Sequence, residues 1–101
     1  MSRHENRTTP KVVSDRVYTD DAYTGTLVGS PQWFAWLSTA STFYYTSRFG
    51  CFTAHCERRQ RGGRYWIAYR RRTAVLQRSH LGKPDQLTLL RLDEAALTLS
   101  L

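Results

Sequence analysis

The sequence predicts a small α+β domain: a three- or four-stranded antiparallel sheet with a C-terminal helix on one face and a short N-terminal helix. Three observations predict this class. Ser30-Pro31 is a helix-start signal, β-branched and aromatic segments flank Gly62-Gly63, and leucines recur at helical spacing near the end. With 101 residues the chain holds one domain, which we expect over residues 28–101.

Residues 1–24 are polar, and their few apolar side chains bury too little surface to join a core. We therefore expect a mobile polar arm, or such an arm with a short ordered piece at residues 12–18. The first residues lack the apolar stretch of a secretory signal, and no apolar run approaches the ~20 residues that span a membrane. The expected location is the cytoplasm.

A short helix is expected to begin at Pro31. The Ser30 hydroxyl can accept a hydrogen bond from a free N–H of the first turn, and proline at the first position has no N–H to leave unpaired. Apolar side chains then recur with helical spacing to about residue 40, and they form one face: Trp33, Trp36, Leu37 and Ala40.

Strands are expected at residues 42–46, 52–60, 64–72 and 75–81, from their β-branched and aromatic composition. Gly62-Gly63 predicts a two-residue hairpin loop, which would pair Arg61 with Arg64. A three-residue loop, 61–63, would instead pair Trp66 with Arg58. The last helix should follow Thr88 as N-cap, and its apolar face is Leu89, Leu92, Ala96 and Leu99.

Positive charge is concentrated in residues 57–83, where nine Lys/Arg oppose one acid, so that the segment carries +8 in a chain of +7. Such a surface favours a polyanionic ligand. With the two-residue loop, one sheet face gathers the residues expected to contact DNA: His55, Arg59, Arg64, Trp66, Arg70 and Arg72. A supporting basic surface is expected from Arg58, Arg61, Arg71, Arg78 and Lys83.

The histidines and cysteines do not have the spacing of a metal site, since no Cys-x-x-Cys or His-x₃₋₅-His pair occurs. Cys51 and Cys56 stand five apart on one expected strand, which predicts opposite faces and no disulfide. Nothing in the sequence supplies an orienting group or an oxyanion site for a cysteine nucleophile. We therefore expect neither an enzyme nor a bound cofactor.

Several motifs match a known family. They are Ser30-Pro31-x-Trp33-Phe34-x-Trp36-Leu37, Phe52-Thr53-Ala54, Glu57-Arg58-Arg59, Gly62-Gly63 with Tyr65-Trp66 and Tyr69-Arg70-Arg71, and Leu81-Gly82-Lys83 followed by Leu87-Thr88. Residues 28–97 thereby resemble the N-terminal module of large LuxR-type, MalT-like bacterial transcriptional regulators. More loosely, the topology is similar to the arm-site DNA-binding domain of tyrosine recombinases. The resemblance implies an accessory or regulatory module; these 101 residues hold no Gly-rich phosphate loop, so ATP binding is not implied.

Three functions remain open from the sequence. The first is binding of duplex DNA through the basic strands. The second is a protein-interaction domain of a larger regulator that docks an acidic partner. The third is binding of RNA or single-stranded nucleic acid through Trp66 and the tyrosines.

Overall fold

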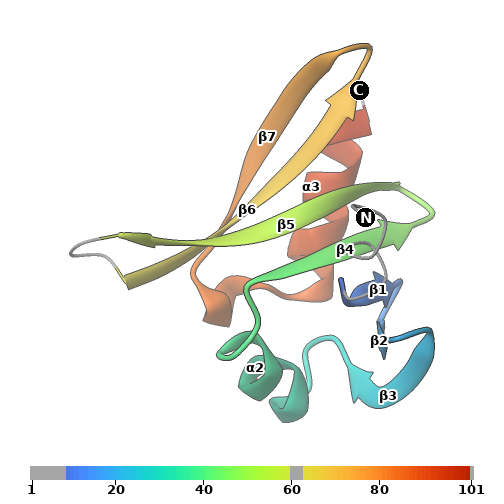
Figure 1. Ribbon diagram of the computed structural model, residues 1–101, viewed down its shortest axis with the longest axis vertical. Helices are drawn as coiled ribbons and strands as arrows, with labels where there is room; N and C mark the ends of the chain where they lie inside the picture. Colours follow the sequence, from blue (N-terminus) through green and yellow to red (C-terminus); the bar gives the residue numbers. More distant parts are fainter. Residues whose placement is uncertain (1–8, 60–62, 101) are drawn as a thin grey trace, which may run out of the picture.

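The structure is a computed structural model that describes residues 9–59 and 63–100. One seven-stranded mixed sheet runs in the order β3-β2-β1-β4-β5-β6-β7 (Figure 1). Only the β1–β4 pair is parallel among the neighbouring strands of this sheet. The strands are β1 (Lys11–Val13), β2 (Arg16–Thr19), β3 (Ala22–Leu27), β4 (Thr42–Ser47), β5 (Gly50–Arg59), β6 (Gly63–Arg72) and β7 (Val75–Gly82). The helices are α2 (Pro31–Leu37), the 3₁₀ turn η1 (Pro84–Gln86) and α3 (Leu89–Ser100).

The predicted sheet of three or four antiparallel strands is wrong, because part of the segment assigned to a mobile arm forms β1, β2 and the first half of β3. Two valines, Val12 and Val17, are fully buried and attach these short strands to the core. Asp20 and Asp21 both adopt positive φ, 52° and 66°, and close the β2–β3 hairpin as a two-residue turn. Residues 1–8 of the predicted arm lie outside the described residues.

The predicted start of the first helix is confirmed. The Ser30 hydroxyl accepts a hydrogen bond from the Trp33 N–H at 3.2 Å, and Pro31 occupies the first helical position. Trp33 is fully buried, and its indole N–H donates to the Leu87 carbonyl at 2.8 Å. This bond ties α2 to the residue that follows η1.

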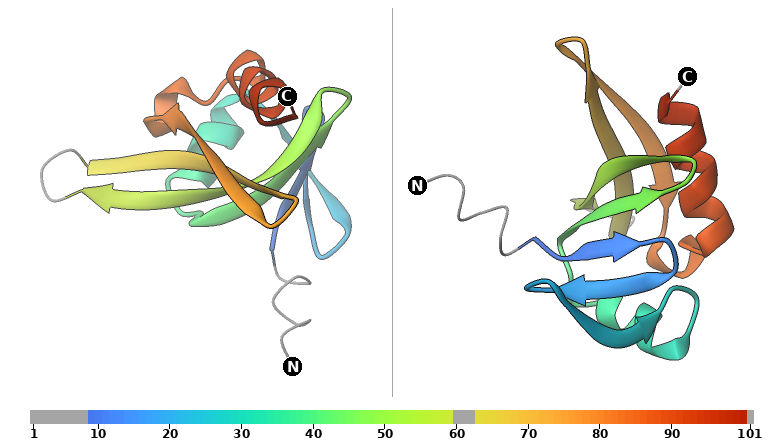
Figure 2. Two further views of the ribbon diagram at one scale, coloured as in Figure 1. Left: turned by 90° about the horizontal axis from the view of Figure 1, so that it is seen from above. Right: turned by 90° about the vertical axis from the view of Figure 1, so that its right-hand side faces the viewer.

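The C-terminal helix α3 covers one face of β4–β7, as the two views of Figure 2 show. The Thr88 hydroxyl accepts from the Arg91 N–H at 3.2 Å, in agreement with the predicted N-cap. The helix buries Leu92, Ala95, Ala96 and Leu99 in the core that contains Phe43, Tyr45, Phe52, Ala54, Trp66 and Ala68 of the sheet. We call this face the helix side and the opposite face of β4–β7 the open side; Figure 1 looks onto the open side.

The register of the β5–β6 hairpin differs from both predicted registers. Cys56 pairs with Trp66, and Arg59 pairs with Gly63, so the connection comprises residues 60–62, which lie outside the described residues. Relative to the two-residue loop, each β5 residue meets a β6 residue three positions earlier. A shift by an odd number reverses the faces of one strand relative to the other. With the two-residue loop, the predicted faces of β5 are correct and those of β6 are reversed. The three-residue alternative is two positions out of register, an even shift, so it gives the correct faces of both strands.

Candidate nucleic-acid interface

The residues predicted to contact DNA do not share one exposed face. His55 lies exposed on the open side, where it was expected. The β6 residues of the set belong to the helix side: Arg64, Trp66, Arg70 and Arg72. The pairing of Arg59 is described, but its side chain lies outside the described part of the chain.

Trp66 is a core residue rather than a stacking platform. Its side chain is 0% exposed, and its ring centroid lies 5.2 Å from that of Phe43. Phe43 in turn contacts Trp33 and Trp36 at 5.7 and 5.9 Å between centroids. Trp66 therefore joins an aromatic cluster between the sheet and α2, and the predicted contact with DNA is wrong for this residue.

Arg64 is bound to the chain that follows α2. Its Nη1 donates to the Ser38 carbonyl and its Nη2 to the Ala40 carbonyl, both at 2.5 Å, and its Nε lies 3.1 Å from the Cys56 sulfur. The last carbonyls of a helix lack intrahelical donors, and a cation is favourable there. Arg72 has a similar position at the end of α3, where its Nη1 donates to the Leu99 carbonyl at 3.4 Å. Both arginines support helix ends.

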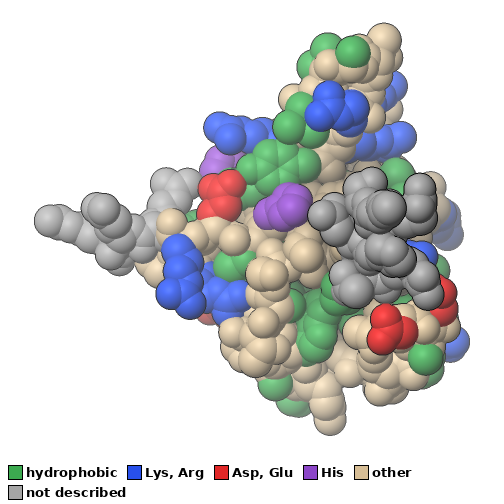
Figure 3. Space-filling model, in the orientation of Figure 1, with side chains coloured by type: hydrophobic (Ala, Val, Ile, Leu, Met, Phe, Trp, Pro, Cys, Tyr) green, Lys and Arg blue, Asp and Glu red, His purple; other side chains and the backbone are tan. Residues whose placement is uncertain are grey.

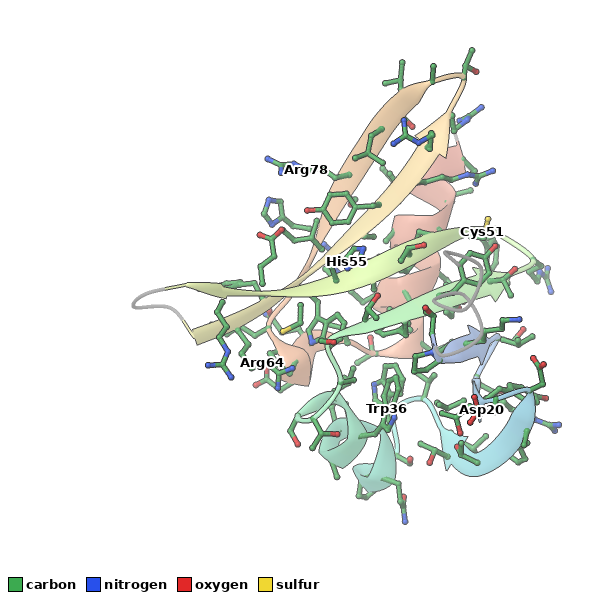
Figure 4. All side chains as sticks on the ribbon, viewed as in Figure 1. Asp20, Trp36, Cys51, His55, Arg64 and Arg78 are labelled. Atoms are coloured by element: carbon green, nitrogen blue, oxygen red, sulfur yellow. The ribbon has the colours of Figure 1, made fainter. Side chains whose placement is uncertain are left out.

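Tyr69 is the centre of a polar cluster on the open side. Its hydroxyl donates to Glu57 Oε2 at 2.8 Å, and its ring meets that of His55 edge-on at 5.4 Å between centroids. Arg78 is its partner on β7. The hydrogen bond to Glu57, followed by burial and by the charge of Glu57, raises the pKa of Tyr69, while Arg78 acts to lower it. Figure 4 shows His55 and Arg78 on this side of the sheet, and Figure 3 shows histidine, acidic and basic side chains at the surface of the same view.

The open side also carries two exposed arginines. Arg71 pairs with Leu76, whose side chain is 54% exposed, and Arg78 pairs with Tyr69. Between the two histidines, Ile67 is 1% exposed and pairs with both His55 and His80. Of the remaining supporting residues, Arg58 is exposed on the helix side opposite Arg64, Lys83 is exposed beyond β7, and Arg61 lies outside the described residues.

A hollow of about 630 Å³ opens where β6 separates from β5. The described pairing of these strands ends at Thr53 and Tyr69, after which β6 continues with β7 alone. The walls combine aromatic rings, cations and a thiol: Tyr44, Cys51, His55, Tyr69, Arg70 and Arg71. A hydrogen bond with Cys51 is the main cause that raises the pKa of Tyr44, and the positive charge of Arg70 opposes it. The hollow therefore offers both aromatic surface and positive charge.

The sequence-based reasoning placed Arg71 and Arg78 only in the supporting basic surface, and it missed Tyr44 and Tyr69 as members of this site. The alternation along β6 was the available signal, but its assignment depended on the length of the loop.

Among the described residues, no group of three or more His, Cys, Asp or Glu is placed to hold a metal ion.

None of the described helices is long and apolar enough to cross a membrane. The chain matches no protein-family model, and neither the curated proteins nor the solved structures yield a significant match.

Proposed function

We propose that this chain binds nucleic acid through the open side of β4–β7. The observation that carries the proposal is the charge and composition of this surface. Arg71 and Arg78 are exposed there beside the Tyr69 and His55 rings. Among the described open-side residues of β4–β7 the acid is Glu57, and the Tyr69 hydroxyl is bonded to it.

Arginine is suited to this role because its planar guanidinium can bind two phosphate oxygens at once. Tyrosine and histidine rings add stacking surface for bases or sugars. Arg64 and Arg72 are excluded from the proposed contacts, since they already donate to carbonyls near helix ends. The context that we propose, following the resemblance, is an accessory module of a bacterial regulator or of a recombinase-like system.

The experiment compares two double variants with the same change in charge. Arg71→Glu/Arg78→Glu alters the open side, while Arg16→Glu/Arg58→Glu alters exposed positions on β2 and on the helix side. Fluorescence anisotropy with labelled duplex and single-stranded DNA gives Kd at about 50 and about 200 mM salt. Each lost phosphate contact should reduce the slope of log K against log salt by about 0.7–0.9.

We expect the open-side double variant to weaken binding at least about tenfold and to flatten the salt slope by about 1.4–1.8. The matched control should remain much closer to the wild-type slope. Equal losses in both double variants would mean that net charge, rather than the open side, attracts the ligand. Binding that barely responds to salt would contradict the proposal and would favour the docking of a protein partner.

A further inference from the structure

An arginine, Arg70, is part of the lining of the hollow beside β5. Arg70 belongs to the helix-side alternation of β6, but it lies beyond the last described β5–β6 pair and lines the hollow. Gly50 makes this position possible. A Cβ at Gly50 would lie 3.3 Å from Arg70 Nη1 and 2.9 Å from the Ala96 carbonyl oxygen. Glycine also tolerates the φ of 142° found there.

The Nη1 atom of Arg70 is buried, yet it has no hydrogen-bond partner among the described residues. A buried donor on a charged group is costly when unpaired, and structures normally pair it with protein, water or ligand. Arg64 and Arg72 nearby on the same strand show the usual outcome, since each donates to backbone carbonyls. Arg70 therefore retains binding capacity for an anion.

The walls of the hollow suit a base. Tyr44 stands on β4, and the Arg70 charge reaches its hydroxyl, where it acts to lower the pKa. His55 and Tyr69 supply two more rings. Glu57 also lines the hollow, and its carboxylate accepts a hydrogen bond from the Tyr69 hydroxyl. A carboxylate repels phosphate, but it can accept hydrogen bonds from the N–H groups of a base. The volume of about 630 Å³ lies within the range of small-molecule sites.

We propose that this hollow is a subsite for one unpaired nucleotide of a single strand. Its phosphate would bind Arg70 and Arg71, and its base would lie against the rings of Tyr44, His55 and Tyr69. Duplex DNA does not present such a unit, because its bases are stacked and paired. The inference rests on the proposed function of the open side and specifies the class of nucleic acid that it takes.

The test uses a labelled oligothymidine of about five nucleotides, a short duplex and inorganic phosphate as probes. Arg70→Gln removes the cation, and Leu76→Glu places a negative charge at the exposed rim without changing the core. Arg72→Gln is the matched control, since Arg72 lies on the same strand and side but is not on the lining of the hollow. Thermal unfolding of each variant checks that it is folded.

We expect Arg70→Gln to weaken oligothymidine binding by about 10- to 100-fold, the range for a lost charged hydrogen bond. Leu76→Glu should also weaken it, because the new carboxylate repels the phosphate at the rim. Arg72→Gln should stay within about twofold of the wild type, and duplex binding should change little in Arg70→Gln and Arg72→Gln. Leu76→Glu should weaken duplex binding as well, because residue 76 faces Arg71 on the open side. Unaltered oligothymidine affinity in folded Arg70→Gln would overturn the subsite. So would displacement of oligothymidine by inorganic phosphate at equal concentration, which indicates a simple oxyanion site. Duplex binding without any oligothymidine binding refutes the subsite alone, whereas absence of all nucleic-acid binding refutes the proposed function as well.

Discussion

A substitution of Arg64 tests whether this arginine of the basic segment stabilises the fold or binds a ligand. Arg64→Gln would remove the charge and the paired donors that reach the Ser38 and Ala40 carbonyls, both at 2.5 Å. Hydrogen bonds of charged groups contribute about 1.5–3 kcal/mol each. Because the Arg64 side chain is partly exposed and its carbonyl partners can bind water, we take the lower end for each bond. The expected loss is about 2–3 kcal/mol of unfolding free energy.

In a domain of this size a loss of 1 kcal/mol lowers Tm by about 4–8 °C, so Arg64→Gln should unfold roughly 10–20 °C earlier. Urea unfolding followed by circular dichroism measures the free energy directly. Nucleic-acid affinity, measured where both proteins are folded, should change little. Arg71→Gln is the control with the opposite pattern, because Arg71 is exposed on the open side. If Arg64→Gln kept its stability within about 0.5 kcal/mol and lost nucleic-acid binding, our account of Arg64 would be wrong.

Two further predictions concern a turn and a buried hydroxyl. Thr73 and Ala74 close the β6–β7 hairpin with positive φ, 51° and 68°. Asparagine and glycine adopt this left-handed region more readily, so Thr73→Asn/Ala74→Gly should raise the unfolding free energy by about 1–2 kcal/mol. A lower Tm would contradict this account of the turn. Burial first, and then a hydrogen bond to Asp93, raise the pKa of Tyr45 above its usual value of 10.0. The stabilisation from protonated Tyr45 is therefore complete below about pH 10 and is lost as pH rises further, by about 1.4 kcal/mol per pH unit. Tyr45→Phe should lower the unfolding free energy by about 1 kcal/mol at neutral pH. In urea titrations between about pH 9 and pH 11, the unfolding free energy of this variant should fall less steeply with pH than that of the wild type. Equal slopes for the two proteins would refute this prediction.

Local signals were sufficient for the helix starts. The Ser30 and Thr88 caps each need only a hydroxyl within three residues of a free N–H, and both form as expected. The faces of β5 also followed from alternation, since Phe52 and Ala54 are buried while His55 is exposed. In each case the information lies within a few consecutive residues.

The faces of β6 could not be predicted in this way, because they depend on where the chain reverses. Gly62-Gly63 is a strong two-residue turn signal, yet Gly63 is already paired with Arg59 and the connection includes residues 60–62. The two-residue turns of the described hairpins are instead Ser14-Asp15, Asp20-Asp21, Arg48-Phe49 and Thr73-Ala74, and none of them contains glycine or asparagine. The register is selected by comparing alternative strand pairings across the whole sheet, and a local sequence pattern does not specify which pairing is the most stable.

The early strands were missed for a related reason. A count of apolar residues over positions 1–24 is low, but a short strand needs only one inward side chain. Val12 and Val17 each provide one, and both are 0% exposed. Parallel pairing of β1 with β4 then brings Lys11 beside Tyr44, a contact between segments some thirty residues apart along the chain. Composition averaged over a window cannot reveal a pairing of this kind.

The same limit applies to the arginines, and it changes what a basic segment implies. Charge count treats Arg64, Arg71 and Arg72 as equivalent, whereas two of them donate to carbonyls at helix ends and one is exposed. A cation that supports a helix end is needed for folding whether or not a ligand exists. The number of phosphates contacted, and hence the salt slope, should therefore follow the exposed open-side arginines and Arg70 rather than the +8 of residues 57–83. Measuring both stability and nucleic-acid affinity for single substitutions separates the two roles. Substitution of a structural arginine lowers the stability, whereas substitution of a binding arginine lowers the affinity.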